Sequence, residues 1–218
     1  MASGRKDRIE GFLKNYTVAP GKSFSLAKRD PADTRHCPDR DKAADILAKD
    51  QAVLTALQNV LFAEGKHALL IVLQAMDTGG KDGIIRRVFG PLNPQGVRVH
   101  SFKAPNYKEV QHDFLWRIHP CVPKRGMIVV FNRSHYEDVL YPAVHQLIDK
   151  DVLKERYRQI NDFEQYLTEN GITILKFFLH ISKDEQKRRL EDRLADPDKH
   201  WKFSSSDLKE RALWDDYQ

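Results

Sequence analysis

The sequence predicts an α/β protein with a three-layer, doubly wound parallel sheet. Two observations lead to this fold class. Short apolar runs of strand length alternate along the chain with longer stretches of helical periodicity. The run over residues 127–131 is apolar throughout, as in strands that are buried on both faces of a parallel sheet. In such a sheet, ligands bind beyond the carboxyl ends of the strands.

The first forty residues differ from the rest of the chain. Residues 1–40 are polar, punctuated by proline and without a clear period, so we expect an arm that wraps the domain. The domain itself is expected over residues 41–218. It opens with a helix over 41–65, in which apolar residues recur at helical spacing until Gly65 ends it.

The rest of the domain continues the alternation of strands and helices. The predicted elements are a strand over 68–74, a loop and helix from 81 to about 89, a strand over 97–102, a helix from about 107 to 118, a strand over 127–131, helices over roughly 134–148 and 151–169, a strand over 172–181, a charged helix from 183 to about 194, a loop over 196–206 and a last helix from near 207. Ser182 and Glu185 are expected to form a capping box at the start of the charged helix.

Composition narrows the class of protein. The chain has 218 residues, 41% of them hydrophobic and 31% charged, which is typical of a soluble globular protein with one sizeable core. No apolar run approaches the ~18 residues of a membrane span. The two cysteines lie far apart and outside any metal-binding spacing, which favours the cytoplasm. The net charge of +5 indicates an anionic partner, but no nucleic-acid-binding signature is present, so we expect neither nucleic acid nor a membrane as partner.

Residues 69–83, LLIVLQAMDTGGKDG, have the layout of a phosphate-binding loop (P-loop). An apolar strand runs into Gly79 and Gly80, Lys81 follows, and a helical pattern begins. Such a turn directs backbone N–H groups into one concavity, and the lysine adds a full positive charge for phosphate oxygens. The match to G-x-x-x-x-G-K-[ST] is imperfect, because Ala75 replaces the first glycine and Asp82 replaces the Ser or Thr.

Two carboxylates, Asp77 and Asp82, stand inside this loop for anions. A structural turn with aspartate as N-cap would explain the glycines and one carboxylate. It would give no role to Lys81 between two carboxylates, whereas a metal that bridges carboxylate to phosphate explains all three residues. We therefore favour a metal site at this loop, with a carboxylate as ligand.

A second cluster, FNRSHYED over residues 131–138, leaves the third strand and should lie near the loop. Asn132 stands where phosphate-loop enzymes usually carry an acidic residue that holds the metal, so Glu137 or Asp138 would supply the missing charge. Arg133 is expected to clamp phosphate. Ser134 and Glu137 also fit a capping box, and His135 is expected to be packed and not catalytic.

A third cluster is the cation-rich segment over residues 183–207. A helix of mixed charge is often only a solvated face, in which Glu191 or Asp192 pairs with the cations. After the fourth strand of a nucleotide-kinase-like fold, however, this segment is where a lid would close over the transferring phosphoryl group and exclude water.

The three clusters together resemble the type-2 polyphosphate kinase family, in particular its class III branch. The stretches VLQAMDTGGKDG, GVRVHSF, FNRSHYEDVL, ILKFFLHISKDEQKRRLEDR and DPDKHWKFSSSD carry the resemblance, which runs from about residue 20 to the end. It implies a thymidylate-kinase-like P-loop kinase core with a helical lid. It also implies a homo-oligomeric polyphosphate kinase that uses Mg²⁺ or Mn²⁺ to transfer phosphoryl groups between inorganic polyphosphate and AMP, ADP or ATP. Because the family normally continues past this C-terminus, we expect a C-terminally truncated kinase domain.

The resemblance also assigns roles to residues. Asp77, Lys81 and Arg133 would be catalytic, with Asp77 holding the metal. Nucleotide binding would fall to Asp82, Asn132 and Glu137. The phosphate-binding residues would be Gly79, Gly80, Lys81, Gly83, Arg133, Arg188, Arg189, Arg193, Lys199 and Lys202. Branches restricted to nucleoside diphosphates tend to carry Asp at the position of Asn132 and another residue at that of Glu137, so the resemblance points to both AMP and ADP as acceptors. An ATP-dependent nucleoside monophosphate kinase of the same fold and a basic nucleic-acid-binding module are the alternatives.

Overall fold

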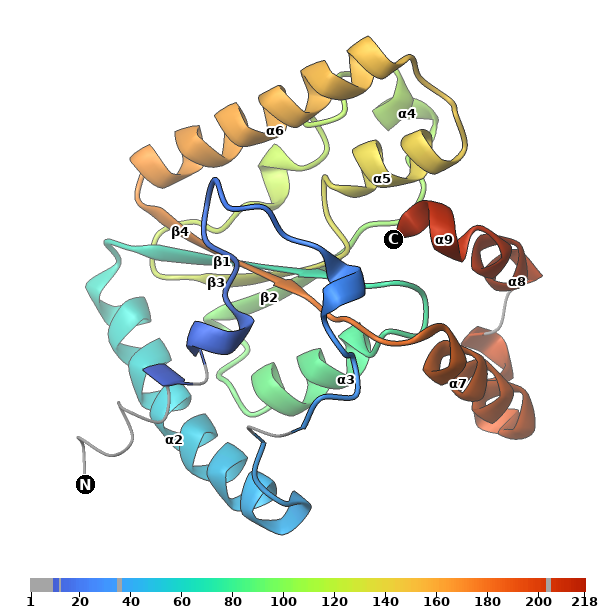
Figure 1. The fold of residues 1–218 in the computed structure, drawn as a ribbon. Coiled ribbons are helices and arrows are strands. Elements are labelled where there is room, and N and C mark those ends of the chain that lie inside the picture. The colour runs from blue at the N-terminus through green and yellow to red at the C-terminus, as the bar shows by residue number, and fades with distance from the viewer. Residues whose placement is uncertain (1–9, 12, 35–36, 203–204) are drawn as a thin grey trace.

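The centre of the protein is a four-stranded, all-parallel sheet (Figure 1). The computed structural model describes residues 10–11, 13–34, 37–202 and 205–218. The strands are β1 Ala68–Gln74, β2 Val97–Ser101, β3 Ile128–Asn132 and β4 Ile172–Phe178, in the spatial order β2-β3-β1-β4. β1 pairs with β3 on one side and β4 on the other. The predicted doubly wound parallel sheet is confirmed.

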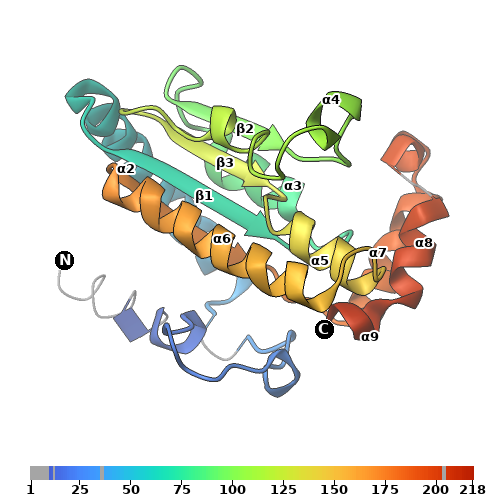
Figure 2. The ribbon, with the colours of Figure 1, turned by 90° about the horizontal axis from the view of Figure 1, so that it is seen from above.

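Helices cover both faces of this sheet and extend from its carboxyl edge. They are α2 Arg40–Glu64, α3 Lys81–Ile84, α4 Tyr107–Val110, α5 Glu137–Val144, α6 Lys150–Glu169, α7 Lys183–Ala195, α8 Ser205–Ala212 and α9 Trp214–Tyr217. α2 and α3 lie on one face, and α5 and α6 lie on the other (Figure 1). Seen from above, α7, α8 and α9 gather beyond the end of the sheet toward which the β1 arrow points (Figure 2). No helix in the part of the chain that the structure describes is long and apolar enough to cross a membrane.

The core forms two layers because side chains of β1 alternate between the faces of the sheet. Leu70 and Val72 belong to the cluster that includes Leu167 of α6. Ile71 and Leu73 belong to the opposite cluster, against which Leu54 of α2 packs. A strand buried on both faces reads as the continuous apolar run seen in the sequence.

Helix α2 is delimited by its own caps. The side chain of Asp39 accepts a hydrogen bond from the Lys42 N–H at 2.9 Å and satisfies a free donor of the first turn. Gly65 adopts φ 58° at the other end, the left-handed conformation that glycine tolerates best. The predicted end at Gly65 is confirmed. Ahead of α2, the described residues include the short 3₁₀ helix η1 Leu26–Lys28.

The predicted helix from about 107 to 118 is wrong. α4 ends at Val110 after a single turn, which the capping box of Asn106 and Glu109 begins. The Asp113 carboxylate then accepts a hydrogen bond from the Leu115 N–H at 3.0 Å and starts a local turn. Such a bond competes with helix formation. A second short 3₁₀ helix, η3 His119–Cys121, follows.

Three further boundaries differ from the prediction. The fourth strand ends at Phe178 and not at 181, because Phe178 pairs with Gln74, where β1 itself ends. The helix expected over 134–148 is confined to α5, because the Ser134 hydroxyl bonds the Tyr136 N–H ahead of it. The expected loop over 196–206 contains the 3₁₀ helix η4 Pro197–Lys202. The helix after the glycine turn ends near residue 89 as expected, although its second half, η2 Ile85–Phe89, is a π-helix.

Candidate active site at the carboxyl end of the sheet

The site lies where β1 and β3 end side by side. Leu73 is in register with Asn132, and the Arg133 N–H donates to the Leu73 carbonyl at 3.1 Å. The chain segments that follow the two strands therefore leave the sheet at the same edge. The sequence predicted this meeting of the glycine-rich loop with the FNRSHYED segment, and the structure confirms it.

The loop after β1 has a conformation that demands small residues. Gly80 adopts φ 101° and serves as N-cap of α3, and a Cβ at Gly79 would collide with the Cβ of Ala75. Thr78, which precedes Gly79, adopts φ 63°, a left-handed conformation that costs a non-glycine residue on the order of 1 kcal/mol. Its hydroxyl is buried and has no hydrogen-bond partner among the described residues.

Lys81 turns back over this loop. Its side chain is buried, and Nζ donates to the carbonyls of Ala75 at 2.8 Å and Met76 at 3.3 Å. Burial lowers the pKa of Lys81, and the nearby Arg133 guanidinium lowers it further. The carboxylates of Asp77, Glu137 and Asp82 act in the opposite direction but do not outweigh burial.

Arg133 binds the loop from the neighbouring strand. It adopts φ 63°, and its guanidinium donates a short hydrogen bond to Asp77 Oδ1. Burial opposes the charge of Arg133, but the carboxylates of Asp77 and Glu137 outweigh it and raise the pKa of Arg133. About a third of the side chain stays exposed, so the guanidinium is accessible to a ligand.

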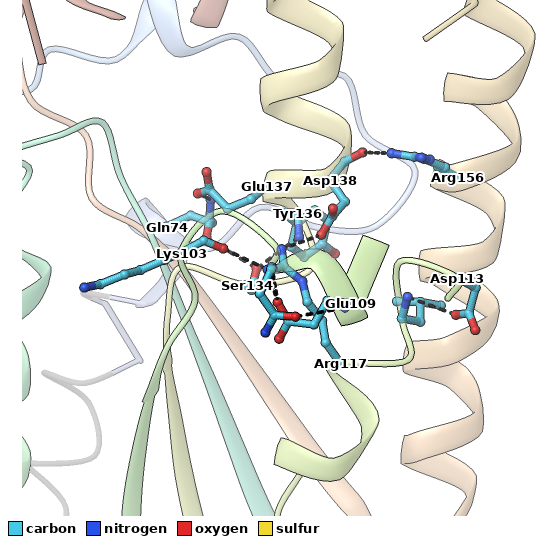
Figure 3. Close-up of polar contacts among 12 residues, drawn as sticks. Gln74, Lys103, Glu109, Asp113, Arg117, Ser134, Tyr136, Glu137, Asp138 and Arg156 are labelled. Carbon is cyan, nitrogen blue, oxygen red and sulfur yellow. Dashed lines mark hydrogen bonds and ion pairs between the residues drawn. The ribbon is translucent and has the colours of Figure 1, made fainter. Parts of the chain in front are cut away.

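Two other predicted site residues are held by side chains from the opposite segment. Asn132 Nδ2 donates to Asp82 Oδ1 at 2.8 Å, so Asp82 faces the end of β3 and does not act as the N-cap of α3. Gln74 Nε2 donates to Glu137 Oε1 at 2.9 Å (Figure 3). The Ser134 hydroxyl donates to Gln74 Oε1 at 3.3 Å, and the predicted capping box of Ser134 and Glu137 is absent. Gln74 was missed, although it is a polar residue at the end of an apolar strand.

Asp138 has a different role from the one expected. It pairs with the buried Arg117 at 3.1 Å, and its carbonyl accepts from Arg156 at 2.6 Å (Figure 3). Arg117 also donates to the carbonyl of Lys103 at 2.8 Å. This network ties α5 to the segment after β2 and to α6, so the charge of Asp138 is used to hold the fold.

His135 is fully buried and packed, as predicted. Its Nε2 lies 3.2 Å from Glu164 Oε1, and the Tyr136 hydroxyl and Lys176 Nζ donate to the same carboxylate at 2.7 and 2.6 Å. Burial alone would raise the pKa of Glu164, but these partners hold it at about 2. The pKa of Tyr136 is raised to about 12, chiefly by burial.

Helix α7 reaches the loop with two side chains. Arg189 donates to the Thr78 carbonyl at 3.0 Å, and Gln186 donates to the Asp77 carbonyl at 3.1 Å. Arg188, by contrast, is exposed and bonds Glu185 and Asp192 of its own helix. Gln186 was not predicted, because the sequence around it reads only as a charged helix.

Four further residues were predicted to bind phosphate. Arg193 lies 3.6 Å from Asp207, and a Cβ at Gly83 would meet open space. The side chains of Lys199 and Lys202 lie outside the described residues. Half of the predicted capping box forms, since Ser182 accepts from the Glu185 N–H at 3.0 Å. The Glu185 carboxylate bonds Arg188 and Arg189 instead.

The described residues contain no group of three or more His, Cys, Asp or Glu side chains that would bind a metal alone. A glycine-rich turn after a central parallel strand, a lysine that starts the next helix and an arginine from the adjacent strand instead define the class of phosphate-loop kinase folds.

Comparison with known proteins identifies the family within this class. The family model described as Polyphosphate kinase 2 (PPK2) matches residues 37–218, and the chain therefore belongs to that family. It is 53% identical over 207 residues to the AMP/ADP-polyphosphate phosphotransferase of Meiothermus ruber, covering 94% of this chain and 78% of the relative. It is 44% identical over 216 residues to the ADP-polyphosphate phosphotransferase of Rhodopseudomonas palustris, covering 94% and 75%. The crystal structure of polyphosphate kinase 2 from Arthrobacter aurescens TC1 superposes with a TM-score of 0.89 at 52% identity, covering 94% of this chain and 74% of that one.

Proposed function

We propose that this protein transfers phosphoryl groups between inorganic polyphosphate and AMP or ADP, and so regenerates ATP from polyphosphate. Membership of the polyphosphate kinase 2 family supports the reaction class. The observation that carries the assignment of the site is the convergence of Lys81, Arg133 and Arg189 on one loop that also bears Asp77.

Polyphosphate carries about one negative charge per phosphate, and these cations would bind its terminal segment. Lys81 Nζ would leave the carbonyls of Ala75 and Met76 for phosphate oxygens, which compensate its buried charge better than neutral dipoles do. Arg133 offers two N–H groups in a planar fork that matches phosphate geometry. Arg189 would approach from the α7 side of the loop.

The residues of the loop fit a divalent ion such as Mg²⁺ or Mn²⁺. Asp77 and Asp82 supply carboxylate oxygens, and the buried Thr78 hydroxyl lacks a partner among the described residues. Mg²⁺ commonly binds one or two carboxylates together with substrate phosphates and water, so a larger protein cage is not needed. When bound, the ion neutralises charge on the transferring phosphoryl group. We assign Asp77 as its main ligand.

The acceptor nucleotide would place its phosphate in line with the terminal phosphoryl group. Asn132, Asp82 and Glu137 border the loop on the β3 side and are the proposed nucleotide-binding residues. A nucleotide phosphate is already ionised at neutral pH, so the reaction needs no general base. Positioning and charge neutralisation provide most of the acceleration in phosphoryl transfer.

The test is a choice of donor. Purified protein with Mg²⁺, AMP and long-chain polyphosphate, but without ATP, should produce ADP and then ATP, and the Lys81→Met variant should produce neither at a comparable rate. An ATP-dependent nucleoside monophosphate kinase would instead make ADP only when ATP is supplied with AMP. That second pattern would contradict the proposal. Replacing AMP by ADP measures the second acceptor separately.

We propose a lid, an N-terminal arm and an oligomeric assembly as well. Residues 183–207 would form a lid over the site and residues 1–40 an arm around the domain, in a homo-oligomer that works in the cytoplasm. Sedimentation equilibrium of the purified protein tests the oligomer, and a monomer at micromolar concentration would contradict it.

A further inference from the structure

Two side chains of α7 hold consecutive carbonyl groups of the phosphate loop. Gln186 Nε2 donates to the Asp77 carbonyl at 3.1 Å, and Arg189 donates to the Thr78 carbonyl at 3.0 Å. The donors stand three residues apart and so share one face of the helix. The backbone of the loop is therefore attached to a third element, α7, in addition to β1 and α3.

The position of Gln186 excludes contact with a substrate. Its side chain is only 1% exposed, the lowest exposure among the polar residues of α7. Its Oε1 accepts from Arg211 of α8 at 3.0 Å, and the same Arg211 nitrogen donates to the Lys183 carbonyl at 2.6 Å. An arginine can only donate and a carbonyl can only accept, so the amide of Gln186 has one possible orientation.

The peptide that Gln186 holds is one that needs support. Thr78 adopts φ 63°, a conformation that persists in a non-glycine residue only where the surroundings fix it. The Asp77 carbonyl and the Thr78 N–H belong to one planar peptide and point in opposite directions. Fixing the carbonyl toward α7 therefore turns that N–H away from α7 and sets the direction in which the Asp77 side chain leaves the backbone.

We infer that Gln186 is a positioning residue for the phosphate loop. Through its bond to the Asp77 carbonyl it keeps the Asp77 carboxylate on Arg133, where both are available to phosphate and metal. The inference rests on the proposed function, since it assumes that Asp77 acts in phosphoryl transfer. Arg211 in turn holds the amide of Gln186 and links α8 to the loop.

The test compares Gln186→Met with the matched control Lys187→Met. Methionine has the length of glutamine but cannot hold either partner, whereas Lys187 is exposed and lies 3.8 Å from Glu191 of its own helix. For Gln186→Met we expect kcat to fall about tenfold. We also expect the Mg²⁺ concentration for half-maximal rate to rise a few-fold, with the KM for AMP unchanged. Lys187→Met should leave all three within about twofold.

Hydrogen exchange supplies a readout that does not depend on activity. Amides of residues 75–80 should exchange faster in Gln186→Met than in the wild type or Lys187→Met, measured by mass spectrometry without substrate. If the wild type does not use polyphosphate, the proposed function is wrong. The exchange measurement still tests whether Gln186 holds the loop through the Asp77 carbonyl. Wild-type exchange together with kcat within twofold in Gln186→Met would overturn the inference.

A second variant covers the case in which Gln186→Met does not fold. Gln186→Glu keeps an acceptor for Arg211 and replaces the donor toward the Asp77 carbonyl by a carboxylate oxygen, which repels that carbonyl. Faster exchange and a lower kcat in this variant, as in Gln186→Met, would support the positioning role of Gln186. Unchanged exchange and unchanged kcat in this variant would refute it.

Discussion

Two polar clusters flank the segment that follows β3, and they are built in opposite ways. One, the Glu164 cluster, consists of His135, Tyr136, Glu164 and Lys176. There a single carboxylate receives hydrogen bonds from Tyr136 and Lys176 and contacts His135, and these partners hold its pKa at about 2. The ammonium group of Lys176 neutralises the charge of Glu164 within the cluster, so no ligand is required to balance it.

The other, the loop cluster, consists of Asp77, Lys81 and Arg133. Here the buried ammonium of Lys81 is held by two neutral carbonyls, and burial lowers its pKa. Arg133 and the adjacent Thr78 both have positive φ angles. Strained backbone is typical of functional sites, and so is a buried cation that has no carboxylate in hydrogen-bond contact among the described residues. Internally balanced charges therefore serve the fold in this molecule, whereas the cation that neutral carbonyls hold lies where we propose the function.

The largest effect should come from the cation of the loop cluster. Lys81→Met should reduce kcat for polyphosphate-dependent AMP phosphorylation about 10²- to 10³-fold, the scale of losing one preorganised charge at the reacting group. The free energy of unfolding in urea should change by less than about 1 kcal/mol, because a buried cation is removed together with its desolvation cost. The exposed Lys66→Met is the matched control and should be silent in both assays. A large loss of stability in Lys81→Met would mean that the loop cluster stabilises the fold as the Glu164 cluster does.

Asp77 should rank next. Asp77→Asn keeps the size of the side chain but loses the charge toward Arg133 and the metal, so we expect turnover to fall about 10²-fold at saturating Mg²⁺. Asp151→Asn, an exposed carboxylate at the start of α6, should leave turnover unchanged. If Asp77→Asn retained near-wild-type transfer with Mg²⁺ present, the metal assignment would have to be abandoned.

The loop cluster could be predicted from the sequence because its signals are local. The glycines, Lys81 and Asp77 follow one apolar strand, and Arg133 follows another, so the rule for parallel sheets brings them together. The helix beyond Asn106 was overestimated for a local reason as well. The Asp113 carboxylate takes the Leu115 N–H and ends the helical path, which an apolar period does not reveal.

The supports behind the site could not be predicted, because they depend on tertiary packing. Gln186 and Asp77 are separated by 109 positions, and Gln74 and Glu137 by 63. Nothing in the residues around Gln186 distinguishes a buried amide from a solvated one in a charged helix. Only the docking of α7 on the loop separates Gln186 and Arg189 from Arg188, which lies on the exposed side.

The Glu164 cluster should matter for stability and not for chemistry. The pKa of Glu164 is lowered from an ordinary value near 4.5 to about 2. The stabilisation that this carboxylate contributes is therefore present above pH 4.5 and is lost as pH falls toward 2. Glu164→Gln should lower the free energy of unfolding at pH 7 by about 2 kcal/mol, and turnover at 25 °C should stay within threefold. The measurement is urea unfolding followed by circular dichroism at pH 7 and at pH 2.5.

Comparing urea unfolding at the two pH values shows whether the charge of Glu164 causes the loss of stability. The difference between wild type and Glu164→Gln should be much smaller at pH 2.5 than at pH 7, because pH 2.5 lies far below the ordinary pKa near 4.5 and close to the folded-state pKa of about 2, so most of the linked stabilisation is lost. Glu155→Gln, on the exposed side of α6 beside Arg158, is the matched control and should change little at either pH. A difference that persists undiminished at pH 2.5 would assign the effect to packing and not to the charge of Glu164.

The smallest effect should separate two neighbouring arginines of α7. Arg189→Gln should raise the KM for polyphosphate or lower kcat by about tenfold, because Arg189 donates to the Thr78 carbonyl beside the phosphate site. Arg188→Gln should change either constant by about twofold at most, since Glu185 and Asp192 already take its charge on an exposed surface. Raising the salt concentration should shrink the Arg188 effect first, because an exposed charge is screened and a half-buried one much less so. Equal losses in the two variants would mean that the whole charged face of α7 contacts polyphosphate, and that contact with the loop does not distinguish its functional cations.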